Sequence, residues 1–185
     1  MRNPFLIGSR IYLRPLDLDD IAALTAWLND PEVTRNLRIY RPLMPMAEEA
    51  FLRKLGESES DIVLGIMARE PEQFIGVTGL HQLDARNRHI QFGITVGEKS
   101  AWGKGYGTEA TRLMVRYAFD TLNLNRVWLH VYEGNERALH VYEKVGFRIE
   151  GRLRQSFYRD GRYWDTLTMA VLREEWKSAD RPLAS

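Results

Sequence analysis

Residues 97–110 read Gly97-Glu-Lys-Ser-Ala-Trp-Gly-Lys-Gly-Tyr-Gly-Thr-Glu-Ala110, with alternating glycines at Gly103, Gly105 and Gly107. The residues before this loop (91–96) have the composition of a strand, and the pattern after it predicts an amphipathic helix. Glycine permits a positive φ and a close approach to backbone N–H groups, while a helix N-terminus carries a dipole that favours anions. A strand, a glycine-rich loop and a helix start together indicate a phosphate site.

Two known phosphate loops can be compared with this one by spacing. A Walker loop requires G-x-x-x-x-G-K-[ST], but Gly97 is one residue too far from Gly103-Lys104, and a glycine stands where the magnesium-binding hydroxyl belongs. The stretch from Gly105 to Ala110 does satisfy the dinucleotide pattern G-x-G-x-x-G/A, which is weak by itself. The antiparallel strands expected before the loop count against a dinucleotide, as does the lack of a suitable acidic residue about 20 positions later. A plain glycine turn also stays open at this point.

Composition and charge are those of an ordinary globular domain. The chain has 185 residues, of which 44% are hydrophobic and 28% charged, and its formal net charge is +1, which indicates no nucleic-acid or anionic membrane partner. It contains no cysteine, which excludes disulfides, thiolate metal sites and a cysteine nucleophile. With no signal-peptide pattern and no apolar run of about 18 residues, a cytoplasmic protein is expected. We expect one domain over residues 1–185, with a core at about 8–176 and a polar tail at 177–185.

Hydrophobic periodicity outlines the elements around the loop. Strands are expected at residues 10–14, 61–69, 74–83, 89–96, 125–133, 147–158 and 163–172. Helices are expected after Asp17, at 46–56, from the glycine loop to about 122, and from Asn135 to a stop at Gly146. Short connections imply antiparallel neighbours, and residues 159–161 predict the turn of a final hairpin. The buried side of the helix at 46–56 is expected to consist of Ala47, Ala50, Phe51 and Leu55.

A second cluster, Asn135-Glu-Arg-Ala-Leu-His-Val-Tyr-Glu-Lys-Val-Gly-Phe147, lies one strand beyond the long helix. Together with residues 102–110 it resembles the GNAT superfamily of acetyl-CoA-dependent N-acetyltransferases. The resemblance is closest to the branch of RimJ/RimL-type protein N-terminal acetyltransferases and bacterial spermidine acetyltransferases. Residues 10–15, 27–31, 122–126 and 159–161 extend it over most of the chain. It implies the GNAT fold, an α/β (α+β) domain whose mixed, mostly antiparallel sheet of about seven strands has helices on both faces.

The resemblance assigns the loop to coenzyme A, with acetyl-CoA as co-substrate and no metal. The loop after the fourth strand would hold the pyrophosphate through backbone N–H groups. Here these belong to Trp102, Gly103, Lys104, Gly105, Tyr106, Gly107 and Thr108. The strand end, Thr95, Val96 and Gly97, would pair with the pantetheine arm like an added strand. Asn135 has two compatible roles, as a helix N-cap and as a coenzyme contact.

The resemblance also places Tyr142 at the position of the general acid. A phenol of pKa about 10 can protonate a leaving thiolate whose thiol has a pKa of about 8.5. Tyr142 lies on the apolar stripe of its helix, so a role in the core is the alternative. The developing oxyanion needs a fixed donor, for which a backbone N–H near Val96 is the candidate. A base is harder to assign, because Gln91 stands where relatives often carry glutamate, and His130 and Glu133 are the remaining candidates nearby.

The expected activity is acetyl transfer to a primary amine by direct attack in a ternary complex. The amide at Gln91 favours a weakly basic acceptor, since an α-amine is about a tenth free at pH 7 and a lysine-like amine only a few parts in ten thousand. A protein N-terminus is therefore preferred, and a polyamine or aminoglycoside-like amine comes second. A coenzyme-binding sensor without turnover and dinucleotide-dependent reduction are the rivals from other classes. No nucleic-acid or membrane partner is expected, and a homodimer is compatible with the resemblance.

Overall fold

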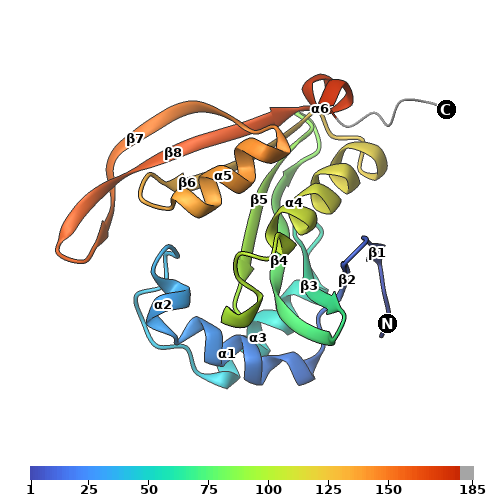
Figure 1. The fold of residues 1–185 in the computed structure, drawn as a ribbon, viewed down its shortest axis with the longest axis vertical. Coiled ribbons are helices and arrows are strands. Elements are labelled where there is room, and N and C mark those ends of the chain that lie inside the picture. The colour runs from blue at the N-terminus through green and yellow to red at the C-terminus, as the bar shows by residue number, and fades with distance from the viewer. Residues whose placement is uncertain (180–185) are drawn as a thin grey trace.

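An eight-stranded mixed sheet carries the helices of the chain (Figure 1). The computed structural model describes residues 1–179. In sheet order the strands are β1 (Leu6–Ile7), β2 (Ile11–Pro15), β3 (Ile62–Arg69), β4 (Glu72–Asp84), β5 (His89–Val96), β6 (Arg126–Tyr132), β8 (Arg162–Leu172) and β7 (Arg148–Arg159). Neighbouring strands are antiparallel except β5 and β6, which are parallel. The expected mixed, mostly antiparallel sheet is confirmed.

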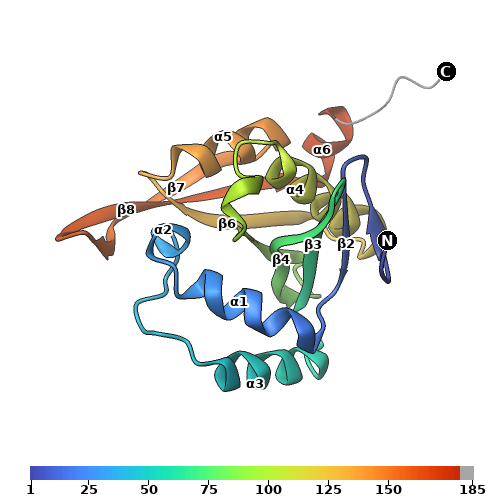
Figure 2. The same ribbon diagram turned by 60° about the horizontal axis from the view of Figure 1, so that its bottom comes forward.

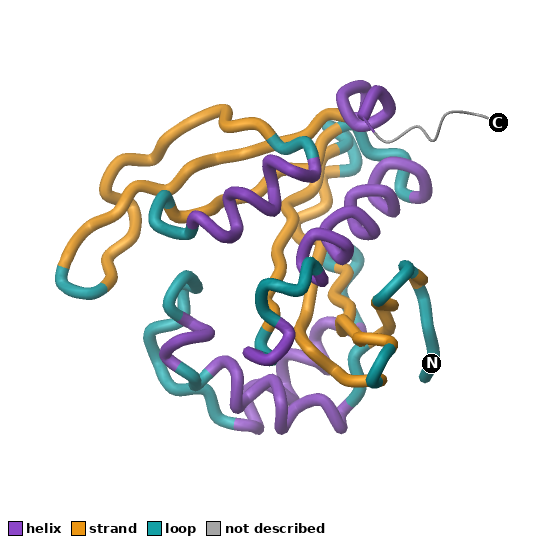
Figure 3. The backbone as a smooth tube through the Cα atoms, viewed as in Figure 1, coloured by secondary structure: helices purple, strands orange, loops and turns teal. Residues whose placement is uncertain are grey.

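Helices cover both faces of this sheet, as Figure 2 shows and Figure 3 sets out by element type. On one face lie α1 (Ile21–Leu28) and α3 (Pro45–Gly56), and on the other α4 (Tyr106–Arg116) and α5 (Glu136–Val145). Shorter helical elements are α2 (Pro31–Thr34), α6 (Arg173–Ala179), a π-helical turn (Tyr117–Thr121) and two 3₁₀ turns (Leu18–Asp20 and Lys99–Ala101). No helix among residues 1–179 has both the length and the hydropathy of a membrane span.

The seven expected strands correspond to β2 through β8. The additional strand, β1, has only two residues and leaves no periodic pattern in the sequence. The final hairpin turns where expected, because Asp160 and Gly161 have φ angles of 54° and 79°, the positive values that a tight two-residue turn requires. The segment from Glu32 to Pro45 has an irregular pattern in the sequence, yet its first residues belong to α2, because Pro31 opens that helix and the Asp30 carboxylate caps it.

The predicted buried face of α3 is wrong. Glu48 is 6% exposed and Phe51 is 47% exposed, whereas the helical pattern assigned Phe51 to the core. The reason is that α3 packs mainly on α1, so it has no wide apolar face against the sheet. This rotation turns the carboxylate of Glu48 toward the interior of the molecule.

The last helix, α6, extends past the expected end of the core at about residue 176 and runs through Ala179. It is anchored by Trp176, which is 5% exposed and packs against Phe119 with ring centroids 6.2 Å apart. The rest of the predicted polar tail, 180–185, lies outside the described residues.

The feature of the sheet that positions the site is the short contact between β5 and β6. They pair over only three residues each, from His89↔Arg126 to Gln91↔Trp128. Beyond that point β6 continues along β8 as far as Tyr132, while β5 continues along β4 as far as Val96. The two strands therefore diverge and leave the facing edge of β5 unpaired after Gln91. The glycine-rich loop and α4 form the crossover that makes β5 and β6 parallel.

Candidate active site

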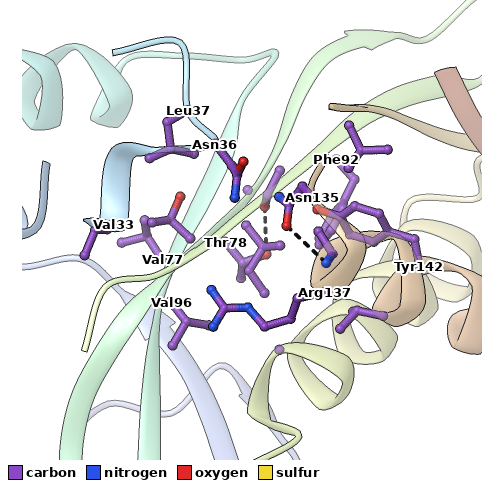
Figure 4. A pocket seen from close by; sticks show the side chains of 18 of the residues that line it. Val33, Asn36, Leu37, Val77, Thr78, Phe92, Val96, Asn135, Arg137 and Tyr142 are labelled. Carbon is purple, nitrogen blue, oxygen red and sulfur yellow. Dashed lines mark hydrogen bonds between the residues drawn. The ribbon is translucent and has the colours of Figure 1, made fainter. Parts of the chain in front are cut away.

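A cavity of about 760 Å³ occupies the divergence of β5 and β6. Its walls come from both faces of the sheet: α1, α2 and α3 on one side, and the glycine-rich loop and α5 on the other. Figure 4 shows Val33 and Leu37 at one end of this cavity, and Tyr142 and Arg137 at the other. Ten of the twelve predicted site residues line it, namely Thr95, Val96, Trp102, Gly103, Gly105, Tyr106, Gly107, Thr108, Asn135 and Tyr142.

The glycine-rich loop has the geometry expected of an anion site. Gly103 and Gly105 have φ angles of 73° and 82°, which side chains tolerate poorly. Gly105 is the N-cap of α4, and no side chain caps that helix, so its first N–H groups are free to meet a ligand. A Cβ at Gly107 would meet only the Val96 Cγ2 atom, at 3.9 Å, and would therefore project into the cavity.

Arg10 anchors this loop, although no sequence motif pointed to it. Its Nη1 donates to the Lys104 carbonyl at 2.7 Å, and its backbone N–H donates to Glu109 Oε1 at 2.9 Å. Burial raises the pKa of Glu109, but hydrogen bonds from Arg10 and Ser9 outweigh it and leave that pKa below its usual value. Glu109 thus stays ionised and ties the start of α4 to the residue before β2.

Trp102 closes the end of the unpaired edge of β5. Its indole Nε1 donates to the Val96 carbonyl at 2.7 Å, and the Arg137 guanidinium lies 4.3 Å from its ring centroid. The pair therefore connects the loop to α5 across the cavity. Trp102 therefore contributes a side-chain donor as well as a backbone N–H to this end of the loop.

Two predicted site residues lie beside the cavity and do not line it. A Cβ at Gly97 would come within 2.1 Å of the Trp27 ring, so glycine is needed there for packing against α1. Lys104 is exposed, and its backbone carbonyl is the acceptor for Arg10. The loop geometry thus accounts for both positions without a ligand contact.

Tyr142 and Asn135 both belong to the α5 side of the cavity (Figure 4). Tyr142 is 7% exposed, and its ring packs edge-on against Phe92 at 6.2 Å. Burial raises the pKa of Tyr142 to about 12, and its hydroxyl makes no hydrogen bond with residues 1–179. Asn135 caps α5 by accepting from the Ala138 N–H at 3.3 Å, so its expected role as N-cap is confirmed.

The base candidates considered from the sequence fare differently. Glu133 accepts from Arg152 Nη1 at 2.8 Å and from the Asp165 N–H at 3.2 Å, which occupies both carboxylate oxygens. His130 does line the cavity, and burial, followed by the charge of Arg38, lowers its pKa. Gln91 lines the cavity as well, at the last pair before β5 and β6 diverge.

The face of the cavity formed by α1–α3 carries a carboxyl group that pattern analysis missed. Glu48 lines the cavity, and no hydrogen bond or ion pair to a described residue engages its side chain. Burial raises its pKa above the usual value. The segment after α2 forms the neighbouring wall and is held by Arg159, whose Nη2 donates to the carbonyls of Thr34, Leu37 and Ile39.

These elements match a known domain. A family model described as an acetyltransferase (GNAT) domain matches residues 10–148. The chain belongs to this GNAT family. It is accordingly an acetyl-CoA-dependent N-acetyltransferase, and the interpretation of the loop as a dinucleotide site is wrong.

Individual relatives of this GNAT acetyltransferase agree with both branches suggested by the sequence. An uncharacterized N-acetyltransferase, p20, of Bacillus licheniformis is 29% identical over 178 residues, covering 92% of this chain and 97% of the relative. A putative ribosomal N-acetyltransferase, YdaF, of Bacillus subtilis is 38% identical over 102 residues, or 55% of each chain. The crystal structure of a spermidine N-acetyltransferase from Vibrio cholerae, in complex with CoA and spermine, superposes with a TM-score of 0.84 at 25% identity, covering 92% of this chain and 99% of that one.

Replacing Gly107 with alanine should separate coenzyme binding from folding. The added methyl group meets no close neighbour in the folded chain, and alanine stabilises a helix relative to glycine by up to about 1 kcal/mol. If the loop holds the coenzyme pyrophosphate as the sequence predicts, the same methyl group would obstruct its approach to the helix N-terminus. We expect an unchanged or higher melting temperature and at least about tenfold weaker CoA binding, a loss of roughly 1.4 kcal/mol. Calorimetric titration measures the affinity, and Gly151→Ala on β7, where an added Cβ would meet nothing within 4 Å, is the control. Equal CoA affinity in both variants would contradict a pyrophosphate site here.

Proposed function

We propose that this GNAT enzyme transfers the acetyl group of acetyl-CoA to a primary amine of a small cationic molecule, by direct attack in a ternary complex. The observation that carries the choice of acceptor is Glu48, a buried cavity carboxyl group without a partner among residues 1–179. A buried carboxylate is unfavourable unless a cation or a set of donors accompanies it. An ammonium group bound in the cavity would supply that cation. The spermine found in the Vibrio relative supports the same class of acceptor.

The coenzyme would lie on the other face, with its pyrophosphate on the N–H groups at the start of α4 and its pantetheine arm along the unpaired edge of β5. Backbone N–H and C=O groups on that edge need partners wherever water is excluded. Asn135 has its side-chain oxygen on the Ala138 N–H, so its amide N–H₂ is available to the coenzyme. The Val96 N–H remains the candidate donor for the oxyanion.

Tyr142 would hold the leaving sulfur as a neutral hydrogen-bond donor. A pKa of about 12 keeps the phenol protonated throughout the physiological range. Complete transfer of its proton to a thiolate of pKa about 8.5 is uphill by roughly 5 kcal/mol. Tyr142 therefore stabilises the charge that develops on sulfur, and the proton follows only as the tetrahedral intermediate collapses.

The α-amine of a protein N-terminus, the acceptor preferred from the sequence, is the second candidate. It is favoured by the amide at Gln91 and by the name of the putative ribosomal relative. Neither candidate requires a covalent enzyme intermediate. A coenzyme sensor without turnover predicts binding alone.

An amine panel tests the proposed acceptor. The enzyme is incubated with acetyl-CoA and with polyamines, an aminoglycoside, free lysine or peptides with different N-termini, and the release of free thiol is followed. We expect the highest kcat/KM for a small amine that carries a second positive charge. Preference for the peptides would favour the protein acceptor, and CoA binding without thiol release for any amine would favour the sensor.

Replacing Tyr142 with phenylalanine removes the hydroxyl and leaves the contact with Phe92 in place. Loss of a donor to the leaving group should lower kcat by about 10²- to 10³-fold, while CoA affinity changes less than about threefold, since a ring contact is kept. Steady-state kinetics and CoA titration measure both. A variant with wild-type kcat would assign Tyr142 to the core.

Replacing Glu48 with glutamine should weaken acceptor binding and stabilise the fold. The KM for the amine should rise about tenfold or more, because a hydrogen bond to a charged group contributes about 1.5–3 kcal/mol. The KM for acetyl-CoA should stay unchanged. A carboxyl group whose pKa is raised by folding opposes stability above its ordinary pKa, so the free energy of unfolding should increase at pH 7 and not at pH 3. Glu49→Gln, which alters a surface pair with Arg53, is the control. An amine KM equal to that of wild type would contradict the assignment.

A further inference from the structure

The cavity also contains a histidine that the sequence did not connect with the chemistry. His81 on β4 lines the cavity, and its Nδ1 lies 3.0 Å from Asp61 Oδ1. Among residues 1–179, Asp61 is the hydrogen-bond partner of this ring, which leaves Nε2 available. We propose that His81, oriented by Asp61, is the general base that takes the proton from the acceptor amine. The inference rests on the proposed transfer to an amine and adds the residue that activates it.

Asp61 is built to stay ionised and to orient the imidazole. Its Oδ2 accepts from the Ser58 and Ser60 hydroxyls at 2.8 and 2.9 Å. Burial raises the pKa of Asp61, but these hydrogen bonds and that of His81 outweigh it, so the net pKa lies below the usual value. An anionic acceptor at Nδ1 requires the proton there and leaves the lone pair on Nε2. The Asp61 carboxylate is thus a positioning group, and Nε2 is the basic atom.

Two glycines make the space in which Nε2 lies. Gly79 on β4 and Gly93 on β5 are cross-strand partners. A Cβ at Gly79 would come within 2.5 Å of His81 Nε2, whereas a Cβ at Gly93 would come no nearer than 3.8 Å to the ring. The imidazole therefore lies over the backbone of Gly79, in a recess that any larger residue would close.

The strand is distorted directly after His81. The pairing of β4 with β5 shifts between His81 and Asp84, and Gln82 has a φ of 54°. A positive φ is unfavourable for a residue with a side chain, and bulges near active sites re-aim side chains. The same Asp61 that orients His81 lies 3.4 Å from the Gln82 N–H, and Leu83 donates to the Ser60 carbonyl. The turn before β3 thus holds both the bulge and the ring.

His81 is placed on the acceptor side of the reacting bond. It pairs in register with Gln91, the last residue of β5 that contacts β6. Side chains alternate along a strand, and the next residue, Phe92, packs on Tyr142. Gln91 and His81 therefore face α1–α3, while Tyr142 approaches from the α5 face. The thioester, in the gap between the strands, would lie between the base and the leaving-group donor.

Other titratable and charged groups that face this cavity do not offer the same arrangement. Besides Tyr142, they are Glu32 and Arg38 in and after α2, Glu48 on α3, Tyr106 on α4, His130 and Tyr132 on β6, and Arg137, His140 and Lys144 on α5. Glu32 is paired with Lys99 at 2.7 Å. The pKa of His130 is lowered by burial and by Arg38, so it is a weaker base. Among the described residues of the cavity, His81 is the histidine with a carboxylate partner.

The proton balance of the step is complete without another reagent. His81 Nε2 takes one proton from the bound ammonium and later returns it to solvent. The free amine nitrogen attacks the thioester carbon, which forms the C–N bond and places the negative charge on oxygen. As the C–S bond breaks, the second amine proton leaves and the departing sulfur is protonated. The products are the N-acetylated amine, free coenzyme A and one released proton.

The test compares the pH dependence of kcat/KM for the best amine of the panel in wild-type enzyme and in His81→Gln. With a base on the enzyme, the profile should level off well below the pKa of the amine, about 10.4 for a polyamine. In His81→Gln it should keep rising toward that pKa, and the value at pH 7 should fall about 10²- to 10³-fold. CoA affinity should be unchanged. His89→Gln is the matched control, because it breaks a second His–Asp pair, between His89 on β5 and Asp84 at the end of β4, and neither residue lines the cavity.

A second pair of variants leaves both His81 and Asp61 in the chain. Gly79→Ala displaces the imidazole, whereas Gly93→Ala leaves it in place. We expect the altered profile in Gly79→Ala and a profile of wild-type shape in Gly93→Ala, with both proteins folded by circular dichroism. If kcat/KM falls in His81→Gln and Gly79→Ala but its pH profile keeps the wild-type shape, the proposal is overturned. It is also overturned if the plateau is lost only in His130→Gln. If wild-type enzyme acetylates no amine, the proposed function itself fails. If wild-type enzyme acetylates an amine and the pH profile of His81→Gln has the same shape as that of wild type, only the role of His81 fails.

Discussion

The early divergence of β5 and β6 is the constraint on which the rest of the site depends. Three residue pairs join these parallel strands, and beyond them β5 has a neighbouring strand only on its β4 side. Unpaired N–H and C=O groups in the interior are costly, and they are tolerated where a ligand supplies the missing partners. The sheet is therefore incomplete by one short segment of extended chain. An acyl-pantetheine arm has both the amide groups and the extended shape to complete it.

The phosphate end of the site follows from the same crossover. Because the chain must leave β5 and return parallel to it as β6, α4 has to start directly above the end of β5. Gly103 and Gly105 allow this sharp entry, and the helix begins with free N–H groups. Arg10, just before β2, and Glu109, on α4, are far apart in the chain, and the hydrogen bonds of Arg10 to Glu109 and to the Lys104 carbonyl hold the loop in position. The topology thus forms the predicted anion site, and the ion pair of Arg10 with Glu109 holds it in place.

The sequence predicted the elements with local signals and missed those made by distant contacts. Glycine spacing, the cap at Asn135 and the stripe containing Tyr142 are each readable within about ten residues, and all three lie where expected. Arg10 meets Glu109 across 99 positions and His81 meets Asp61 across 20, so no window contains either pair. Glu48 was missed because a helix that packs on another helix need not follow the usual apolar stripe. The hydrophobic pattern of a helix predicts its buried face only where the helix packs against a broad surface such as a sheet.

In the proposed mechanism, the sheet keeps the leaving-group donor, Tyr142, apart from the base, His81. Tyr142, buried among aromatic rings on the α5 face, is kept neutral by desolvation. His81 lies on the opposite face, beside an ionised carboxylate with two hydroxyl donors. The two groups thus have different surroundings, as the acid and base groups of one site commonly do. The backbone of β5 stands between them, so a proton cannot pass directly from one to the other. In the proposed mechanism, the substrates in the divergence of β5 and β6 connect them, because the attacking nitrogen and the leaving sulfur are bonded to the same carbonyl carbon.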